Sequence, residues 1–146
     1  MEYRFFDKTA YVRMDTGEEL IGTLLGFCRE QKITSAVFSG IGGCSRAEIQ
    51  TFIPERGTFE TRVITGTLEM VTLNGNITSV GKGEHNYHAH AVLAYIEDGE
   101  HRMAGGHLKS ATVLYTSEIE VRPVSGGVIR GKFDPETGTR LWSFDG

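Results

Sequence analysis

The sequence predicts an α+β domain in which a largely antiparallel sheet is covered by one main helix. Many short segments alternate between apolar and polar residues, several are separated by hairpin turn signals, and only one has apolar residues at helical spacing. A chain of 146 residues can bury one core, so we expect a single domain over residues 1–146. Within it, residues from about 124 to 146 are expected to form a C-terminal tail docked on the rest.

The first predicted elements are a strand over Thr9–Met14 and, after it, the helix. Thr16 and Glu19 fit a capping box, in which Thr16 is the N-cap and the Glu19 side chain bonds back to its amide. Arg29 and Lys32 suit the negative end of the helix dipole. The apolar stripe at helical spacing consists of Leu20, Ile21, Leu24, Leu25 and Cys28. We therefore expect this helix to pack on one face of a sheet.

A glycine-rich segment follows a predicted strand at Ser35–Phe38. Residues 39–43 look like the start of a dinucleotide-binding loop. However, Ser45 stands where that loop needs a glycine, and residues 46–50 alternate like a strand instead of opening a helix. We therefore expect either a turn with unusual φ angles or a close approach of two backbones, and no phosphate-binding loop.

Turn signals define most of the remaining strands. Residues 54–57 predict one turn, and Asn74-Gly75 predicts a second one of type I′. Residues 133–138 predict a turn in the tail, with Leu141 and Trp142 as its apolar anchor. The strands expected around these turns and towards the end of the sheet are 47–53, 59–64, 66–73, 76–80, 111–115 and 118–121.

The central feature of the sequence is a predicted hairpin. Residues His88–Glu97 are rich in apolar side chains and predict a strand that ends at Asp98-Gly99. Asp-Gly favours a two-residue type I′ turn, because both central residues of that turn need positive φ. With this turn Glu97 pairs with Glu100, which fixes the register of the returning strand.

This register predicts a metal site. It places His90 directly opposite His107, and His88 lies on the same face because strand side chains alternate. Three imidazoles on one face can bind one divalent ion, and zinc is the first choice because it favours tetrahedral nitrogen sites. A bulge at Gly105-Gly106 would shift the register and turn His107 away. Without a metal, the three rings would form a hydrogen-bonded cluster.

The same strand indicates an oligomer. Its apolar side chains are Val92, Ala94 and Ile96 on one face, and Ala89, Ala91 and Leu93 on the other. One helix cannot cover both faces of a sheet, so a partner subunit is the expected cover of the second face.

Charge and composition narrow the possible partners. The chain has 19 acidic and 15 basic residues, a formal net charge of -4 and no basic run. Direct nucleic-acid binding would therefore need a local basic patch. Residues 1–4 lack the layout of a signal peptide, and the apolar runs are too short to cross a membrane. We expect a soluble, cytoplasmic protein without a membrane partner.

Several segments stand in a characteristic order and spacing. They are Gly66–Leu68, Leu73–Ile77, His88–Ala94, Gly105–Leu108 and Thr116–Ile119, together with Ser39–Gly42 and Phe133–Gly138. This arrangement resembles the PPC domain (plants and prokaryotes conserved, also written PCC) over nearly the whole chain. The resemblance implies a compact α+β fold that assembles as a homotrimer. It also implies a metal ion at the positions of His88, His90 and His107.

The resemblance leaves two kinds of function open. In plants the domain is joined to an Arg-Gly-Arg-Pro minor-groove binder, so stand-alone prokaryotic members are regarded as candidate DNA-binding proteins. That motif does not occur here. The first expectation is a trimeric DNA-binding or regulatory module with a three-histidine metal site, whose DNA-binding residues the sequence does not identify. The alternative is a zinc-type enzyme acting on an unknown small substrate, with Glu84, His85 or Glu118 as candidate general base.

Overall fold

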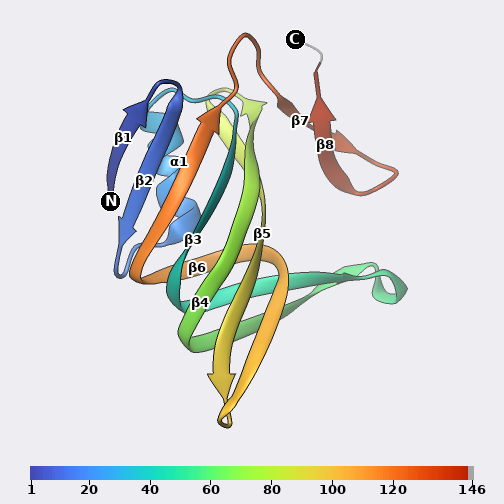
Figure 1. The fold of residues 1–146 in the computed structure, drawn as a ribbon. Helices are drawn as coiled ribbons and strands as arrows, with labels where there is room; N and C mark the ends of the chain where they lie inside the picture. Colours follow the sequence, from blue (N-terminus) through green and yellow to red (C-terminus); the bar gives the residue numbers. More distant parts are fainter. Residues whose placement is uncertain (145–146) are drawn as a thin grey trace.

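A computed structural model describes residues 1–144, which form one eight-stranded sheet with one α-helix packed on it (Figure 1). The elements are β1 (Glu2–Phe6), β2 (Thr9–Asp15), α1 (Leu20–Glu30), β3 (Ala36–Ile53), a 3-10 turn (Pro54–Arg56), β4 (Thr58–Gly81), β5 (Glu84–Glu97), β6 (Glu100–Pro123), β7 (Arg130–Asp134) and β8 (Thr139–Ser143). Within this range, strands pair antiparallel except for one parallel pair between β4 and β7. The predicted α+β class is confirmed.

Four long strands form the body of the sheet. β3 pairs with β4 and β6, and β5 pairs with the same two strands, so the four strands close into a ring. β6 pairs with β5 from Glu100 to His107, and with β3 from His107 to Pro123. His107 is therefore the residue at which β6 changes partner, and the pairing of β6 with β5 ends at this point.

The glycine-rich segment does not form a turn. Residues 39–43 continue within β3, between β4 and β6. A Cβ on Gly40 would lie 2.5 Å from the Glu118 carbonyl oxygen, and a Cβ on Gly43 would lie 2.6 Å from the Leu114 carbonyl oxygen. The expected close approach of two backbones is thus confirmed, and the expected turn is not found. A side chain at Gly40 or Gly43 would push β6 away.

The type I′ turn predicted at Asn74-Gly75 is wrong. These residues lie inside β4, with β3 on one side and β5 on the other. A Cβ on Gly75 would lie 2.6 Å from the His88 carbonyl oxygen and would overlap the Phe38 ring. The glycine is needed for packing between strands, not for a turn. The true turn between β4 and β5 is Lys82-Gly83, whose φ angles are 53° and 77°.

The helix begins later than predicted. Its N-cap is Glu19, whose carboxylate accepts hydrogen bonds from the backbone N–H groups of Ile21 and Gly22 at 3.3 and 2.6 Å. The capping box with Thr16 as N-cap is therefore wrong, and the Thr16 hydroxyl donates instead to the Tyr115 carbonyl. Backbone hydrogen bonds tie the segment before the helix to β6, so this segment cannot form a first helical turn.

The helix covers one face of the sheet. Its fully buried residues are Leu20, Ile21, Leu24, Phe27 and Cys28, so the predicted stripe is confirmed with Phe27 added and Leu25 only partly buried. Ala89, Ala91 and Leu93 of β5 belong to the same core. On the other face of β5, Val92 and Ala94 are partly exposed and Ile96 is exposed, so the chain itself leaves this face uncovered.

The tail forms a hairpin of β7 and β8 at the edge of the sheet (Figure 1). Asp134 accepts hydrogen bonds from the Thr137 amide and hydroxyl at 3.0 and 2.6 Å, which confirms the predicted turn. The Trp142 indole N–H donates to the Asn76 side chain at 3.3 Å, yet Trp142 remains 49% exposed. The contact between tail and domain is therefore shallow. No helix within residues 1–144 is long and apolar enough to cross a membrane.

Candidate metal centre

The β5–β6 hairpin has the register predicted from its turn. Asp98 and Gly99 have φ angles of 54° and 76°, as a type I′ turn requires. From this turn the pairing runs without a shift to His90, which lies opposite His107. Gly105-Gly106 therefore does not bulge this strand pair, and His107 stays on the face of His88 and His90.

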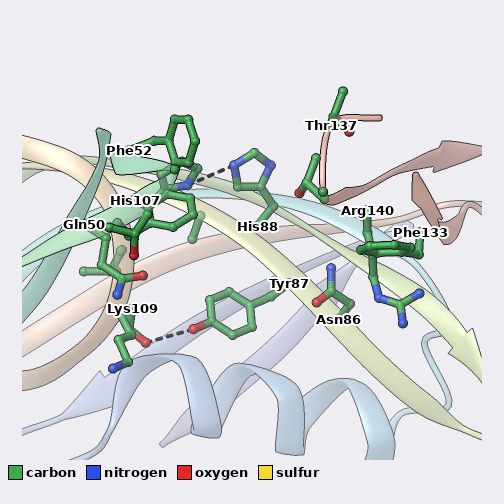
Figure 2. A pocket seen from close by; sticks show the side chains of 17 residues that line it. Gln50, Phe52, Asn86, Tyr87, His88, His107, Lys109, Phe133, Thr137 and Arg140 are labelled. Carbon is green, nitrogen blue, oxygen red and sulfur yellow. Dashed lines mark hydrogen bonds between the residues drawn. The ribbon is translucent and has the colours of Figure 1, made fainter. Parts of the chain in front are cut away.

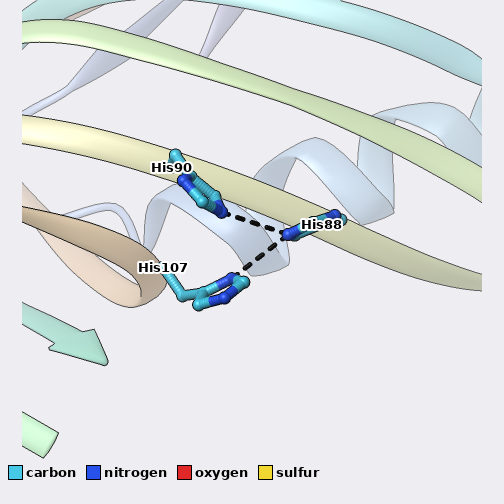
Figure 3. A group of neighbouring side chains, drawn as sticks. All are labelled: His88, His90 and His107. Atoms are coloured by element: carbon cyan, nitrogen blue, oxygen red, sulfur yellow. Dashed lines mark hydrogen bonds between the residues drawn. The ribbon is translucent and has the colours of Figure 1, made fainter. Parts of the chain in front are cut away.

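The three histidine side chains converge on one another. Nε2 of His88 lies 3.1 Å from Nε2 of His90 and 3.1 Å from Nδ1 of His107 (Figure 3). One ring nitrogen from each histidine can be chosen so that the three nitrogens all lie within 4.8 Å of one another. In a tetrahedral zinc site with Zn–N bonds of about 2.0–2.1 Å, ligand nitrogens are roughly 3.3 Å apart. Two of the three separations are already close to that value.

Partial loss of hydration favours the metal-binding form of two of the rings. Loss of hydration lowers the pKa of His88 and of His107 below the usual imidazole value, and repulsion from a charged His90 lowers both further. At neutral pH these rings are therefore uncharged, and each has a nitrogen lone pair that can be donated. Metal ligation needs this state, because a protonated imidazole cannot bind.

The surroundings of the cluster are aromatic on one side and open on the other. The Phe59 ring meets His107 edge to face, with ring centroids 5.2 Å apart. His88 and His90 are exposed to solvent. Among residues 1–144, no carboxylate accepts a hydrogen bond from these rings, so packing and mutual contact orient them.

The candidate general bases do not join this cluster. His85 lies on the opposite face of β5, where its Nε2 is 2.7 Å from the Ile33 carbonyl oxygen. Glu118 lines a separate depression beside β1 and β2. Glu84 starts β5, and four residues of extended strand place it roughly 13 Å from His88. None of the three belongs to the group of possible metal ligands.

A cleft that the sequence analysis missed lies beside the histidines. β5 and β6 diverge beyond the His90–His107 pair, and the Tyr87 hydroxyl donates to the Lys109 carbonyl at 2.9 Å across the opening. The cleft has a volume of about 880 Å³, and the β3–β4 hairpin and the tail complete its walls (Figure 2). Four segments far apart in the sequence meet here, so no local motif could have predicted it.

Comparison with known proteins identifies the family. The sequence matches the Plants and Prokaryotes Conserved (PCC) domain over residues 1–125. The chain belongs to the PCC domain family. The resemblance noted from the sequence is thereby confirmed, and the β7–β8 tail lies beyond the matched range of the PCC domain. A search of curated proteins gives no match.

Solved structures share the fold of this PCC-domain chain. A protein from Bacteroides thetaiotaomicron, 23% identical, superposes with a TM-score of 0.88 over 99% of this chain and 98% of its own. A candidate DNA-binding protein from Ralstonia eutropha is 27% identical, with a TM-score of 0.84 over 97% of this chain and 94% of its own. A protein from Archaeoglobus fulgidus described as metal-containing is 30% identical, with a TM-score of 0.81 over 98% and 99%.

Proposed function

We propose that this PCC-domain protein binds one divalent metal ion, zinc in the first place, through His88, His90 and His107. The convergence of one nitrogen from each ring within 4.8 Å carries the proposal. The similar Archaeoglobus protein, described as metal-containing, supports it. Three neutral nitrogen ligands with an open fourth position suit zinc, although copper binds such ligands more tightly in the general order of affinities.

The metal content of the full-length protein tests this proposal. Protein grown without added metal should contain about one metal ion per chain by plasma mass spectrometry, as expected for a single three-ligand site. Protein stripped with a chelator should take up one equivalent of zinc in a calorimetric titration. If the stripped protein binds no zinc, the histidines form only a hydrogen-bonded cluster and the proposal fails.

The proposed role is that of a cytoplasmic, trimeric DNA-binding or regulatory module, whose direct affinity for DNA is weak or whose contact with DNA runs through partners. A similar protein from Ralstonia is a candidate DNA-binding protein. This chain has a net charge of -4, and neutralisation of phosphates by basic residues dominates non-specific affinity. Fluorescence anisotropy with a random duplex at about 0.15 M salt should therefore show no submicromolar binding. Tight, salt-dependent binding would instead reveal a basic surface formed by the assembled subunits.

The alternative function is a metal-dependent enzyme for a small substrate. The cleft beside His88 and His107 favours this alternative, because a substrate lying there would be next to the metal ligands. Bound zinc would supply a water whose pKa is lowered to about 7. Turnover that disappears on chelation and returns with zinc would establish the enzyme. The absence of turnover with both ester and phosphoester substrates would favour the regulatory module.

A further inference from the structure

We propose that the cleft between β5 and β6 binds a small organic anion with a flat apolar body, and that Arg140 of the tail holds its acid group. The cleft extends the proposed metal centre, since His88 and His107 form one of its walls. The recognition of the anion, however, rests on residues outside the histidine cluster. It can therefore be tested in the metal-free protein.

The cleft exists because the two strands separate. Beyond the His90–His107 pair, β6 turns to β3 and the remaining part of β5 pairs with β4 alone. The hydrogen bond from Tyr87 to the Lys109 carbonyl holds the two strands together at the base of this opening. A volume of about 880 Å³ lies within the range of roughly 300–1,000 Å³ that is typical of small-molecule sites.

The charged groups of the cleft are all basic. Its walls include Lys109 and Arg140 but no aspartate or glutamate, in a chain whose net charge is -4. Lys109 is partly neutralised by Glu48, whose carboxylate lies 3.6 Å from its ammonium. An anion placed in the cleft would therefore meet attraction without a competing carboxylate in its lining.

Arg140 is the stronger of the two basic groups. One of its guanidinium nitrogens donates to the Gly131 carbonyl at 2.8 Å, and this contact holds the side chain in place. It forms no ion pair with any residue in the range 1–144. A guanidinium has five N–H donors in a planar fork, so several remain for a carboxylate or phosphate. This geometry favours an acid group with two or more oxygens.

Aromatic side chains supply the rest of the surface. Phe52 and Phe59 lie edge to face with centroids 5.3 Å apart on the β3–β4 hairpin. Phe133 of β7 lines the tail side of the cleft, away from Phe52 (Figure 2). The three residues are 47%, 45% and 56% exposed, so each ring leaves about half of its surface to solvent. A flat apolar group lying against Phe52 and Phe59 would remove part of this surface from water, and aromatic rings pack well against such groups.

The test uses the full-length protein after chelation and compares two probes of equal shape, 2-naphthoate and its neutral amide. In calorimetric titrations the acid should bind about tenfold more tightly than the amide, the factor expected for hydrogen bonds to a charged group. Arg140→Gln should remove this advantage and leave amide binding unchanged. Arg122→Gln, which changes a surface arginine outside the cleft, should keep the advantage. Phe59→Ala should weaken both probes.

Three outcomes would overturn the proposal. They are equal affinity for acid and amide, an unchanged preference for the acid in Arg140→Gln, and binding of the acid only after zinc is added. The last result would mean that the metal, and not Arg140, holds the acid group. Zinc content is measured in the same samples, so a failure of the metal site and a failure of anion binding are distinguished. Arg140→Lys, which keeps the charge but loses the fork, should retain only part of the preference and guards against misfolding of Arg140→Gln.

Discussion

His107 is the residue that turns a pair of histidines into a three-ligand site. His88 and His90 share a face through strand alternation alone, whereas His107 comes from another strand and depends on the register. It is also the residue at which β6 changes partner from β5 to β3. His107 therefore belongs to the candidate metal centre and also marks the point at which β6 leaves β5 and continues along β3.

Single substitutions test the ligand set. Replacing His88, His90 or His107 with Ala should each abolish tight zinc binding, because two imidazoles do not fill a stable zinc site. His101→Ala is the matched control: it removes a histidine from the same hairpin, opposite Ile96 and near the turn. Zinc per chain, measured by plasma mass spectrometry, should be normal in this variant. If His107→Ala retained normal zinc content, the proposed ligand set would be wrong.

Protonation of His88 and His107 should compete with zinc only below the usual imidazole range. In the metal-free protein, the ring protons of His88 and His107 should titrate below pH 6.5 by NMR, because partial loss of hydration lowers the pKa of both groups. Competition between protons and zinc for these two rings should accordingly appear only below that pH. Since the unfolded chain then binds more protons than the folded one, metal-free stability should also decrease as pH falls through this range. Titration midpoints above pH 7 would contradict this prediction.

Among the elements, the hairpin that forms the site was predictable and several long strands were not. Asp98-Gly99 specifies its turn locally, so the sequence alone gives the register down to His107. Asn74-Gly75 has an equally strong local preference, yet packing of Phe38 and of β5 against Gly75 holds it in a strand. Tertiary contacts here override turn propensity. The cleft could not be predicted from local sequence either, because it depends on the tertiary strand pairing that decides where β6 changes partner.

The start of α1 depends on Glu19. This carboxylate accepts hydrogen bonds from two backbone N–H groups of the first helical turn and from the Ala111 N–H of β6. Glu19→Ala should lower the free energy of unfolding by about 1–2 kcal/mol, the usual cost of losing an N-cap. Glu30→Ala, at the exposed end of the same helix, should change it by less than about 0.5 kcal/mol. Urea denaturation followed by circular dichroism measures both, and equal effects would contradict the capping role.

The chain itself leaves one face of the β5–β6 hairpin uncovered. Ala94 lies opposite Met103 and Ile96 lies opposite His101, so Met103 and Ile96 belong to the face that also carries the histidines. Ile96 is 58% exposed and Met103 is 65% exposed. Such apolar surface beside the candidate metal centre is typical of a subunit interface. The proposed homotrimer would bury it.

We expect the protein to be a homotrimer in solution. Size exclusion coupled to light scattering should give about three times the chain mass at micromolar concentration, because burial of the exposed apolar face favours association. Ile96→Asp should shift the protein towards monomer, since a carboxylate buried in an apolar interface without a partner is costly. Glu97→Gln, one residue along on the opposite face, should leave the mass unchanged. A wild-type monomer would rule out the trimer, and an Ile96→Asp protein that stays trimeric would place the interface on another surface.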